Sequence, residues 1–286
     1  MKLPFAFARR FVAGESFPQA LPAIRTLTDQ GLFVTLDMLG EYVSDRHVAE
    51  RARDAYIELI KVTNASRNFR MEANISIKLS MLGQKIDEAF CLDNLRQLLA
   101  VAKEEDVFVR LDMEGSDITA STLGLFETVF PDYPDHVGVV LQAYLKRTAD
   151  DVRRMCELKA RVRICKGAYK EPADIAYQDM PTIRARYMEY ARLLITEGRY
   201  PGIATHDDQL IDSVKAFVQD EGIPLDRFEF QMLYGIRPKT QLQLRSEGYN
   251  MRVYIPYGTE WVPYFNRRLR ERKENIWFVV KNLFRA

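Results

Sequence analysis

The sequence predicts a single α/β domain folded as a (β/α)₈ barrel of the TIM type. Short apolar or β-branched runs alternate with segments whose apolar residues recur three and four positions apart. Eight such runs follow one another within about 250 residues, which is the strand number and length typical of this barrel. A doubly wound open sheet is the competing architecture, because the same alternation of strands and helices would also produce it.

The predicted strands are taken in chain order from runs such as LFVTLD and VGVVLQA. Between them, apolar residues line one face of each helical segment, as in Leu95, Leu98, Leu99 and Ala102. Residues 1–30 form a predicted N-terminal helical extension, residues 31–286 the barrel and a last helix, and no linker divides the chain 1–286. The strands are expected at 32–37, 74–79, 107–113, 137–143, 161–166, 202–205, 227–232 and 251–256.

Composition excludes several classes of protein. Lys and Arg number 41 against 40 Asp and Glu, so no global field favours nucleic acid. The three cysteines lack CxxC spacing, which argues against a disulfide framework and fits a reducing compartment. The N-terminal apolar run is too short for a signal peptide, and no stretch approaches the roughly 18 apolar residues of a membrane span. We therefore expect a cytoplasmic protein.

Polar side chains stand at the ends of seven of the eight predicted strands. In a barrel these ends open onto one face, where active sites are built. Any one of these side chains could simply be exposed to solvent, but together their chemical types indicate an active site. They are Lys78, Asp112, Gln142, Arg163 with Lys166, Thr205 with His206, Gln231 and Tyr254.

Several kinds of chemistry lack support in the sequence. The only histidines, His47, His136 and His206, are far apart, so no metal site is expected. His47 and His136 are interpreted as surface residues, while His206 follows a strand. There is no GxSxG for a serine nucleophile, and Cys165 lies within a strand, where packing is its expected role. No GxG occurs, so a nucleotide cofactor would need something other than a glycine-rich turn.

A cluster of arginines follows the last predicted strand, in the segment 261–275. On a helix, Tyr264 shares a face with Arg267 and Arg268, three and four positions later. Adjacent arginines on a helix are often only solvated. At a barrel mouth, however, two guanidinium groups could bind a carboxylate.

Seven segments in order resemble the flavin-dependent proline dehydrogenases over about residues 33–275. The resemblance is to the monofunctional bacterial form, and it implies a distorted barrel with the final helix over its mouth. The segments are IKLSMLG (77–83), RLDMEGS (110–116), LQAYLKRT (141–148), VRICKGAYKEP (162–172), ATHDD (204–208), FEFQMLYGIR (228–237) and VYIPYG with YFNRRLRER (253–272).

The resemblance assigns roles to individual residues. Asp112 and Arg163 would be catalytic, with Arg163 at the N5 edge of FAD, where reduction deposits electron density. Glu41, in LDMLGE, would pair with Arg267 and gate the site, and Tyr169 would line the pocket. Substrate would contact Lys78, Tyr254, Tyr264, Arg267 and Arg268. FAD would contact Met113, Gln142, Arg163, Lys166, Gly167, Ala168, Thr205 and His206.

The implied reaction is oxidation of L-proline to Δ1-pyrroline-5-carboxylate, the first step of proline catabolism, by hydride transfer to FAD. A quinone would then take the electrons, which implies peripheral contact with the inner membrane, and transient contact with the downstream pyrroline-5-carboxylate dehydrogenase is expected. Two other readings of the strand ends stay open. A Schiff-base aldolase could use Lys78 or Lys166, and a catalytically silent barrel could bind an amino acid.

Overall fold

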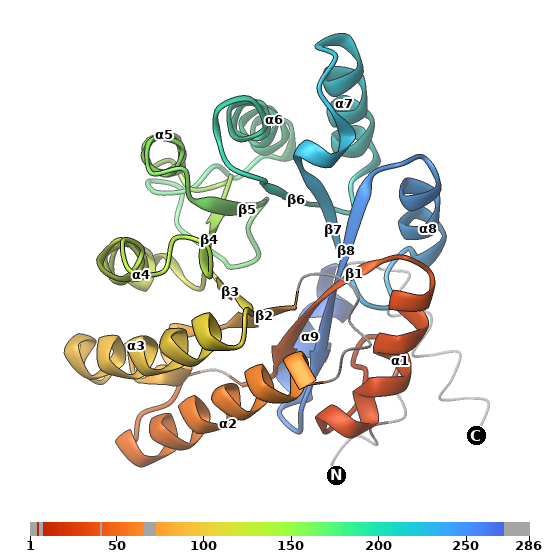
Figure 1. Ribbon diagram of the computed structural model, residues 1–286. Coiled ribbons are helices and arrows are strands. Elements are labelled where there is room, and N and C mark those ends of the chain that lie inside the picture. Colours follow the sequence, from red (N-terminus) through yellow and green to blue (C-terminus); the bar gives the residue numbers. More distant parts are fainter. Residues whose placement is uncertain (1–4, 6–7, 41, 66–72, 272–286) are drawn as a thin grey trace.

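Eight parallel strands close into a barrel in the computed structural model, which describes residue 5 and residues 8–40, 42–65 and 73–271 (Figure 1). Each strand pairs with its neighbours in sequence, and β8 pairs with β1 to close the ring. The (β/α)₈ prediction is therefore confirmed. The strands are β1 Phe33–Met38, β2 Asn74–Ile77, β3 Phe108–Leu111, β4 Val137–Gln142, β5 Arg161–Cys165, β6 Gly202–Ala204, β7 Glu229–Leu233 and β8 Asn250–Tyr257.

The strand limits agree with the prediction to within two residues, and β2 shows why they differ. The run NISIKL predicted a strand to residue 79, but β2 ends at Ile77 and the 3₁₀ helix η2 (Leu79–Leu82) follows. Gly83 ends that turn with a φ of 93°, a backbone conformation that glycine adopts without strain. Lys78 therefore lies between strand and turn, at the carboxyl end of the barrel.

Helices surround the barrel, and Figure 1 shows them as a ring outside the strands. The apolar faces of the first eight α-helices pack on the outer faces of the strands in one continuous core. The short 3₁₀ helix η3 (Leu225–Arg227) precedes β7. The α-helices are α1 Phe17–Asp29, α2 Arg46–Ala65, α3 Glu88–Glu104, α4 Ser116–Val129, α5 Thr148–Glu157, α6 Met180–Glu197, α7 Asp208–Asp220, α8 Pro238–Ser246 and α9 Trp261–Glu271.

The interior of the barrel is unusually polar. Arg110, Glu229 and Arg252 are each 1% exposed and point across it from β3, β7 and β8. Gly138 leaves room for Arg110, because a Cβ at Gly138 would lie 2.7 Å from an Nη of that residue. Gly202 leaves room for Gln231, because a Cβ at Gly202 would overlap the Gln231 amide. TIM barrels more commonly fill this space with branched apolar residues.

A second, smaller core holds α9 against the N-terminal segment. Phe11 packs on Phe265, and Trp261 contacts both Phe265 and Phe5. Tyr264 belongs to the same cluster and is 5% exposed. This packing fixes the start of α9 beside the carboxyl ends of the strands. Of the helices whose residues the structure describes, none has the length and apolar character that crossing a membrane would require.

Candidate active site

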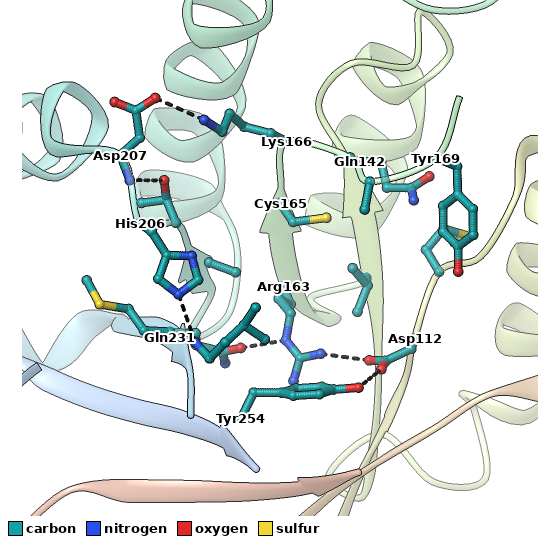
Figure 2. A pocket seen from close by; sticks show the side chains of 18 of the residues that line it. Asp112, Gln142, Arg163, Cys165, Lys166, Tyr169, His206, Asp207, Gln231 and Tyr254 are labelled. Atoms are coloured by element: carbon teal, nitrogen blue, oxygen red, sulfur yellow. Dashed lines mark hydrogen bonds and ion pairs between the residues drawn. The ribbon is translucent and has the colours of Figure 1, made fainter. Parts of the chain in front are cut away.

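A cavity of about 810 Å³ opens at the carboxyl ends of the strands (Figure 2). Its volume lies in the range of sites that enclose small molecules and cofactors. Residues from all eight strands or the turns that follow them contribute to it. Among its lining are all the predicted site residues whose side chains the structure describes: Lys78, Asp112, Met113, Gln142, Arg163, Lys166, Gly167, Ala168, Thr205, His206, Tyr254 and Tyr264, together with Tyr169.

Arg163 is held at three of its nitrogens. Nε donates to Oε1 of Gln231 at 2.5 Å, one Nη donates to Asp112 at 2.7 Å, and the other donates to Ser76 at 3.0 Å. The second oxygen of Asp112 accepts a 2.7 Å hydrogen bond from the hydroxyl of Tyr254. Burial raises the pKa of that tyrosine well above its usual value, so it stays a donor. Asp112 thus links the arginine to the tyrosine ring, as Figure 2 shows.

Lys78 forms a buried ion pair with Asp37, at 2.7 Å between Nζ and Oδ1. Burial lowers the pKa of Lys78, but the interactions with Asp37, Tyr56 and Asp112 together outweigh it and raise the pKa above the ordinary value. Burial also raises the pKa of Asp37. Asp37 was not predicted as a site residue, although the predicted strand LFVTLD ends on it. The same polar-end pattern that identified the other seven strands would have found it.

Gln142 lines the cavity, and its side chain has a buried oxygen without a partner among the described residues. Its Nε2 donates to the backbone oxygen of Glu114 at 3.3 Å, whereas its Oε1 accepts no hydrogen bond. Buried polar atoms are normally satisfied, so an unpaired acceptor in a cavity wall suits a ligand N–H group. The isoalloxazine ring of a flavin carries one such group.

Two cations stand at the rim of the cavity around one carboxylate. Lys166 follows β5, and Arg184 lies on α6. Both contact the same oxygen of Asp207, Lys166 at 2.9 Å and Arg184 at 2.8 Å. Burial would raise the pKa of Asp207, but the hydrogen bonds from Arg184 and Lys166 outweigh it and lower the pKa. Arg184 and Asp207 were not predicted, because Arg184 is one of many helical arginines and only the fold brings it here.

His206 is fixed by the backbone. Its Nε2 accepts a hydrogen bond from the amide of Leu233 at 2.9 Å, so in the neutral ring the proton lies on Nδ1. His47 has an 85% exposed side chain, as expected for a surface residue. His136 was also interpreted as a surface residue, but its side chain is only 18% exposed beside Asp106. Within the described part of the chain, no group of three His, Cys, Asp or Glu side chains could hold a metal ion.

The turn after β5 covers one side of the cavity. Gly167 has a φ of 116° and packs directly on the ring of Tyr144, where a Cβ would not fit. Farther on, the carboxylate of Glu171 accepts from the backbone N and the Oγ of Ser116, at 2.8 and 2.5 Å. These contacts hold the segment KGAYKE against the N-terminus of α4. Cys165 lines the cavity as well, and its thiol donates to the backbone oxygen of Leu141.

Three predicted residues cannot be placed against this geometry. Glu41 lies outside the described residues, and the side chains of Arg267 and Arg268 also lie outside what the structure describes. Their helix, α9, is placed up to Glu271, and Tyr264 from its first turns lines the cavity.

Comparison with known proteins identifies the family. The family model "Proline dehydrogenase" matches residues 20–281. The chain is 40% identical to "Proline dehydrogenase 1" of Bacillus subtilis, over 97% of this chain and 91% of that protein. It is 42% identical to "Proline dehydrogenase" of Deinococcus radiodurans, over 98% and 90%.

A solved structure shows the same fold. Proline utilization A from Bdellovibrio bacteriovorus, inactivated by N-propargylglycine, superposes with a TM-score of 0.86 at 26% identity, covering 93% of this chain. The match spans 32% of that much longer protein. The closed eight-stranded barrel, the cavity at its carboxyl end and the matches over nearly the whole chain lead to one conclusion: this chain belongs to the proline dehydrogenase family.

Proposed function

We propose that this proline dehydrogenase binds FAD in the cavity at the carboxyl ends of the strands and oxidises L-proline to Δ1-pyrroline-5-carboxylate there. The observation that carries the proposal is the fixed guanidinium of Arg163, bonded to Asp112, Gln231 and Ser76 and facing the cavity. A cation held in this way can stabilise negative charge that develops on a bound group.

The residues of the cavity suit a flavin. The unpaired Oε1 of Gln142 would accept from the N–H of the ring, and Lys166 and Arg184 would face the pyrophosphate at the rim. Met113, Gly167, Ala168, Thr205 and His206 would complete the contacts. When bound, FAD supplies the acceptor for the hydride that leaves C5 of proline.

Proline would bind through its carboxylate and its ring. The ammonium of Lys78 would attract the carboxylate together with Arg267 and Arg268, and Glu41 would pair with Arg267 to gate access. The rings of Tyr254 and Tyr264 would pack on the pyrrolidine and exclude water. Because Asp112 already holds the Tyr254 hydroxyl, that ring is oriented before substrate arrives. Fixing the reactants in this way can contribute several kcal/mol, on the order of 7–11, to lowering the barrier.

The Schiff-base alternative is disfavoured by the contacts of its two candidate lysines. A nucleophilic amine must be neutral. Lys78 is paired with Asp37 and its pKa is raised, while Lys166 is paired with Asp207. The raised pKa keeps Lys78 in the charged, unreactive form, and Asp207 holds Nζ of Lys166 at 2.9 Å.

The electrons would pass from FAD to a quinone. We infer a cytoplasmic enzyme that touches the inner membrane peripherally and releases its product to the downstream pyrroline-5-carboxylate dehydrogenase, in transient contact.

Purification followed by anaerobic titration tests the proposal. The protein should be yellow, hold one FAD per chain and lose its visible absorption when L-proline is added without oxygen. A colourless protein that cannot be reconstituted with FAD would overturn it. Borohydride added with substrate should trap no covalent adduct, whereas an aldolase would form one.

A further inference from the structure

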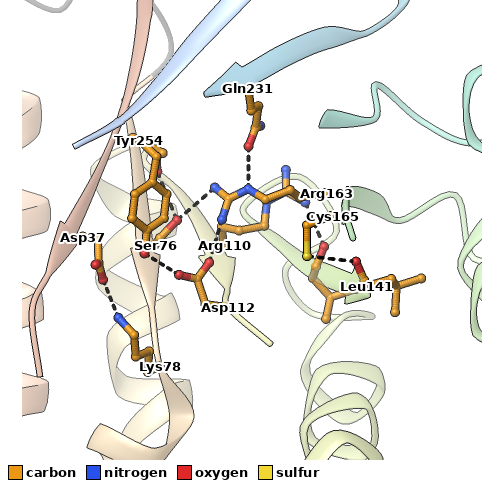
Figure 3. Close-up of polar contacts among 12 residues, drawn as sticks. Asp37, Ser76, Lys78, Arg110, Asp112, Leu141, Arg163, Cys165, Gln231 and Tyr254 are labelled. Atoms are coloured by element: carbon orange, nitrogen blue, oxygen red, sulfur yellow. Dashed lines mark hydrogen bonds and ion pairs between the residues drawn. The ribbon is translucent and has the colours of Figure 1, made fainter. Parts of the chain in front are cut away.

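A series of buried polar side chains leads from the amino end of the barrel to the candidate site. Arg252 donates two hydrogen bonds to the carboxylate of Glu229, at 2.7 and 2.9 Å. The same carboxylate accepts a hydrogen bond from Nε2 of Gln231 at 2.5 Å. Gln231 in turn accepts from Nε of Arg163. The four side chains are between 1% and 6% exposed. We call Arg252, Glu229, Gln231 and Arg163 the barrel-floor network; Figure 3 shows its upper end, where Gln231 meets Arg163.

The two neighbours of Gln231 fix the direction of its amide. The carboxylate of Glu229, paired with Arg252, can only accept, and the guanidinium of Arg163 can only donate. The amide nitrogen of Gln231 must therefore face Glu229, and its oxygen must face Arg163. An apolar residue of the same length would make neither bond, and a carboxylate would meet Glu229 with like charge.

The wall of the barrel is shaped for this amide. Gly202 on β6 pairs with Glu229 on β7, and a Cβ at Gly202 would overlap Nε2 of Gln231. Neighbouring strands thus provide space for the amide as well as partners for it.

Stability alone is a weak reason for such an arrangement. Replacing a buried ion pair by apolar residues of similar volume is often neutral or stabilising, because desolvation offsets the attraction between the charges. The network instead ends on the guanidinium of Arg163, which lines the cavity. With Gln231, Asp112 and Ser76 at three of its nitrogens, the plane of Arg163 has little freedom to turn.

We propose that Gln231 and Glu229 are positioning residues for the flavin-dependent reaction: Glu229 orients the Gln231 amide, and that amide holds the guanidinium of Arg163 in the plane and at the depth where it favours flavin reduction. The proposal rests on the proposed function, because it requires FAD beside Arg163. Neither residue touches the reacting atoms; both act through Arg163.

The first test replaces Gln231 with Met, which keeps length and volume but neither donates nor accepts. Gln84→Met is the matched control: Gln84 is also buried and donates to Ser121 and Thr122, but it does not line the cavity. Three quantities are measured on each purified holoenzyme: the thermal midpoint, the flavin midpoint potential, and the anaerobic rate of flavin reduction by proline.

Both variants should lose similar thermal stability, and only Gln231→Met should change the flavin. Its equilibrium constant for two-electron reduction should fall about tenfold, a potential lower by about 30 mV. The maximal reduction rate should fall about tenfold or more, while the proline concentration for half-maximal rate stays within threefold. A potential and rate equal to those of Gln84→Met would overturn the proposal. Wild-type enzyme without proline-bleachable flavin would instead refute the proposed function.

An exchange variant decides the matter if Gln231→Met does not fold. In Glu229→Gln with Gln231→Glu, the total charge and side-chain volume are unchanged, but the carboxylate moves next to Arg163. It should neutralise the guanidinium more directly and lower the flavin potential by about 30 mV or more relative to the wild type. A potential equal to that of the wild type in this double variant would contradict the proposal.

Discussion

The ammonium of Lys78 lies 2.7 Å from the carboxylate of Asp37, and both groups are buried at the base of the candidate site. Asp112 and Tyr254 stand nearby, as Figure 3 shows. Although burial opposes the charge on Lys78, the carboxylate of Asp37 raises its pKa. The lysine is therefore protonated across the neutral and moderately alkaline range and can attract a substrate carboxylate there.

Replacing Asp37 with Asn should make ligand binding depend on pH. With its main counter-charge removed, burial should lower the pKa of Lys78. In the wild type, the raised pKa keeps Lys78 charged as pH rises. In Asp37→Asn, the lowered pKa means that Lys78 loses its positive charge within the measurable pH range. Cyclopentanecarboxylate, which has no amine to titrate, serves as the ligand, with flavin absorbance as the readout. Its affinity should fall roughly tenfold or more between pH 6.5 and 9, since hydrogen bonds to charged groups contribute about 1.5–3 kcal/mol.

Two comparisons check this interpretation. Lys78→Met should bind the same ligand weakly at every pH, and the wild type should bind it almost equally across the range. An Asp37→Asn profile as flat as that of the wild type would mean that Asp37 does not set the charge of Lys78.

Arg268→Met should weaken proline binding and leave the FAD content unchanged. If the arginine binds the carboxylate, its loss removes a charge-assisted hydrogen bond and raises KM by about one to two decades. Arg51→Met is the control, because Arg51 is exposed on α2 and does not line the cavity. Steady-state kinetics with flavin-normalised enzyme distinguish the two. Equal KM values for both variants would remove Arg268 from the carboxylate site.

Glu171→Ala should destabilise the protein through α4. The N-cap residue of α4, Gly115, has no side chain that could accept a hydrogen bond from the first turn of the helix. The carboxylate of Glu171, in the turn after β5, accepts the bond from the backbone N of Ser116 instead. Loss of a helix cap destabilises a protein by about 1 kcal/mol. For a protein of this size, the expected drop in Tm is roughly 2–3 °C. Ser116→Ala completes a double-mutant cycle, and the effects of the two changes should not add. Strict additivity would show that the contact does not contribute.

The barrel and most of the site could be predicted because their signals are local. An apolar run that ends in a polar residue predicts both a strand and its position at the barrel mouth. Residues predicted in this way, such as Gln142 and His206, line the same cavity. Asp37 also ends an apolar run, so the same pattern would have predicted it as a site residue.

The remaining residues depend on contacts between distant parts of the chain. Arg163 and Gln231 are 68 positions apart, and Glu229 and Arg252 are 23 apart. In the sequence, Glu229 and Arg252 resemble the solvent-facing half of an alternating strand. Only closure of the barrel turns that face inward, where Gly138 and Gly202 make space that no periodicity reveals.

Two glycine substitutions should have opposite effects on stability. Gly138→Ala places a Cβ against the backbone oxygen of Arg161 and 2.7 Å from Arg110, inside the polar interior. Overpacking of this kind destabilises by about 1–3 kcal/mol, because neither strand backbone nor a buried guanidinium can move aside freely. Gly124→Ala, within α4, meets nothing within 4 Å and should stabilise by about 0.5–1 kcal/mol through helix propensity. Urea unfolding of the two variants measures both shifts. If Gly138→Ala were as stable as the wild type, the interior of the barrel would have room for the added methyl group, which would contradict tight packing around Gly138.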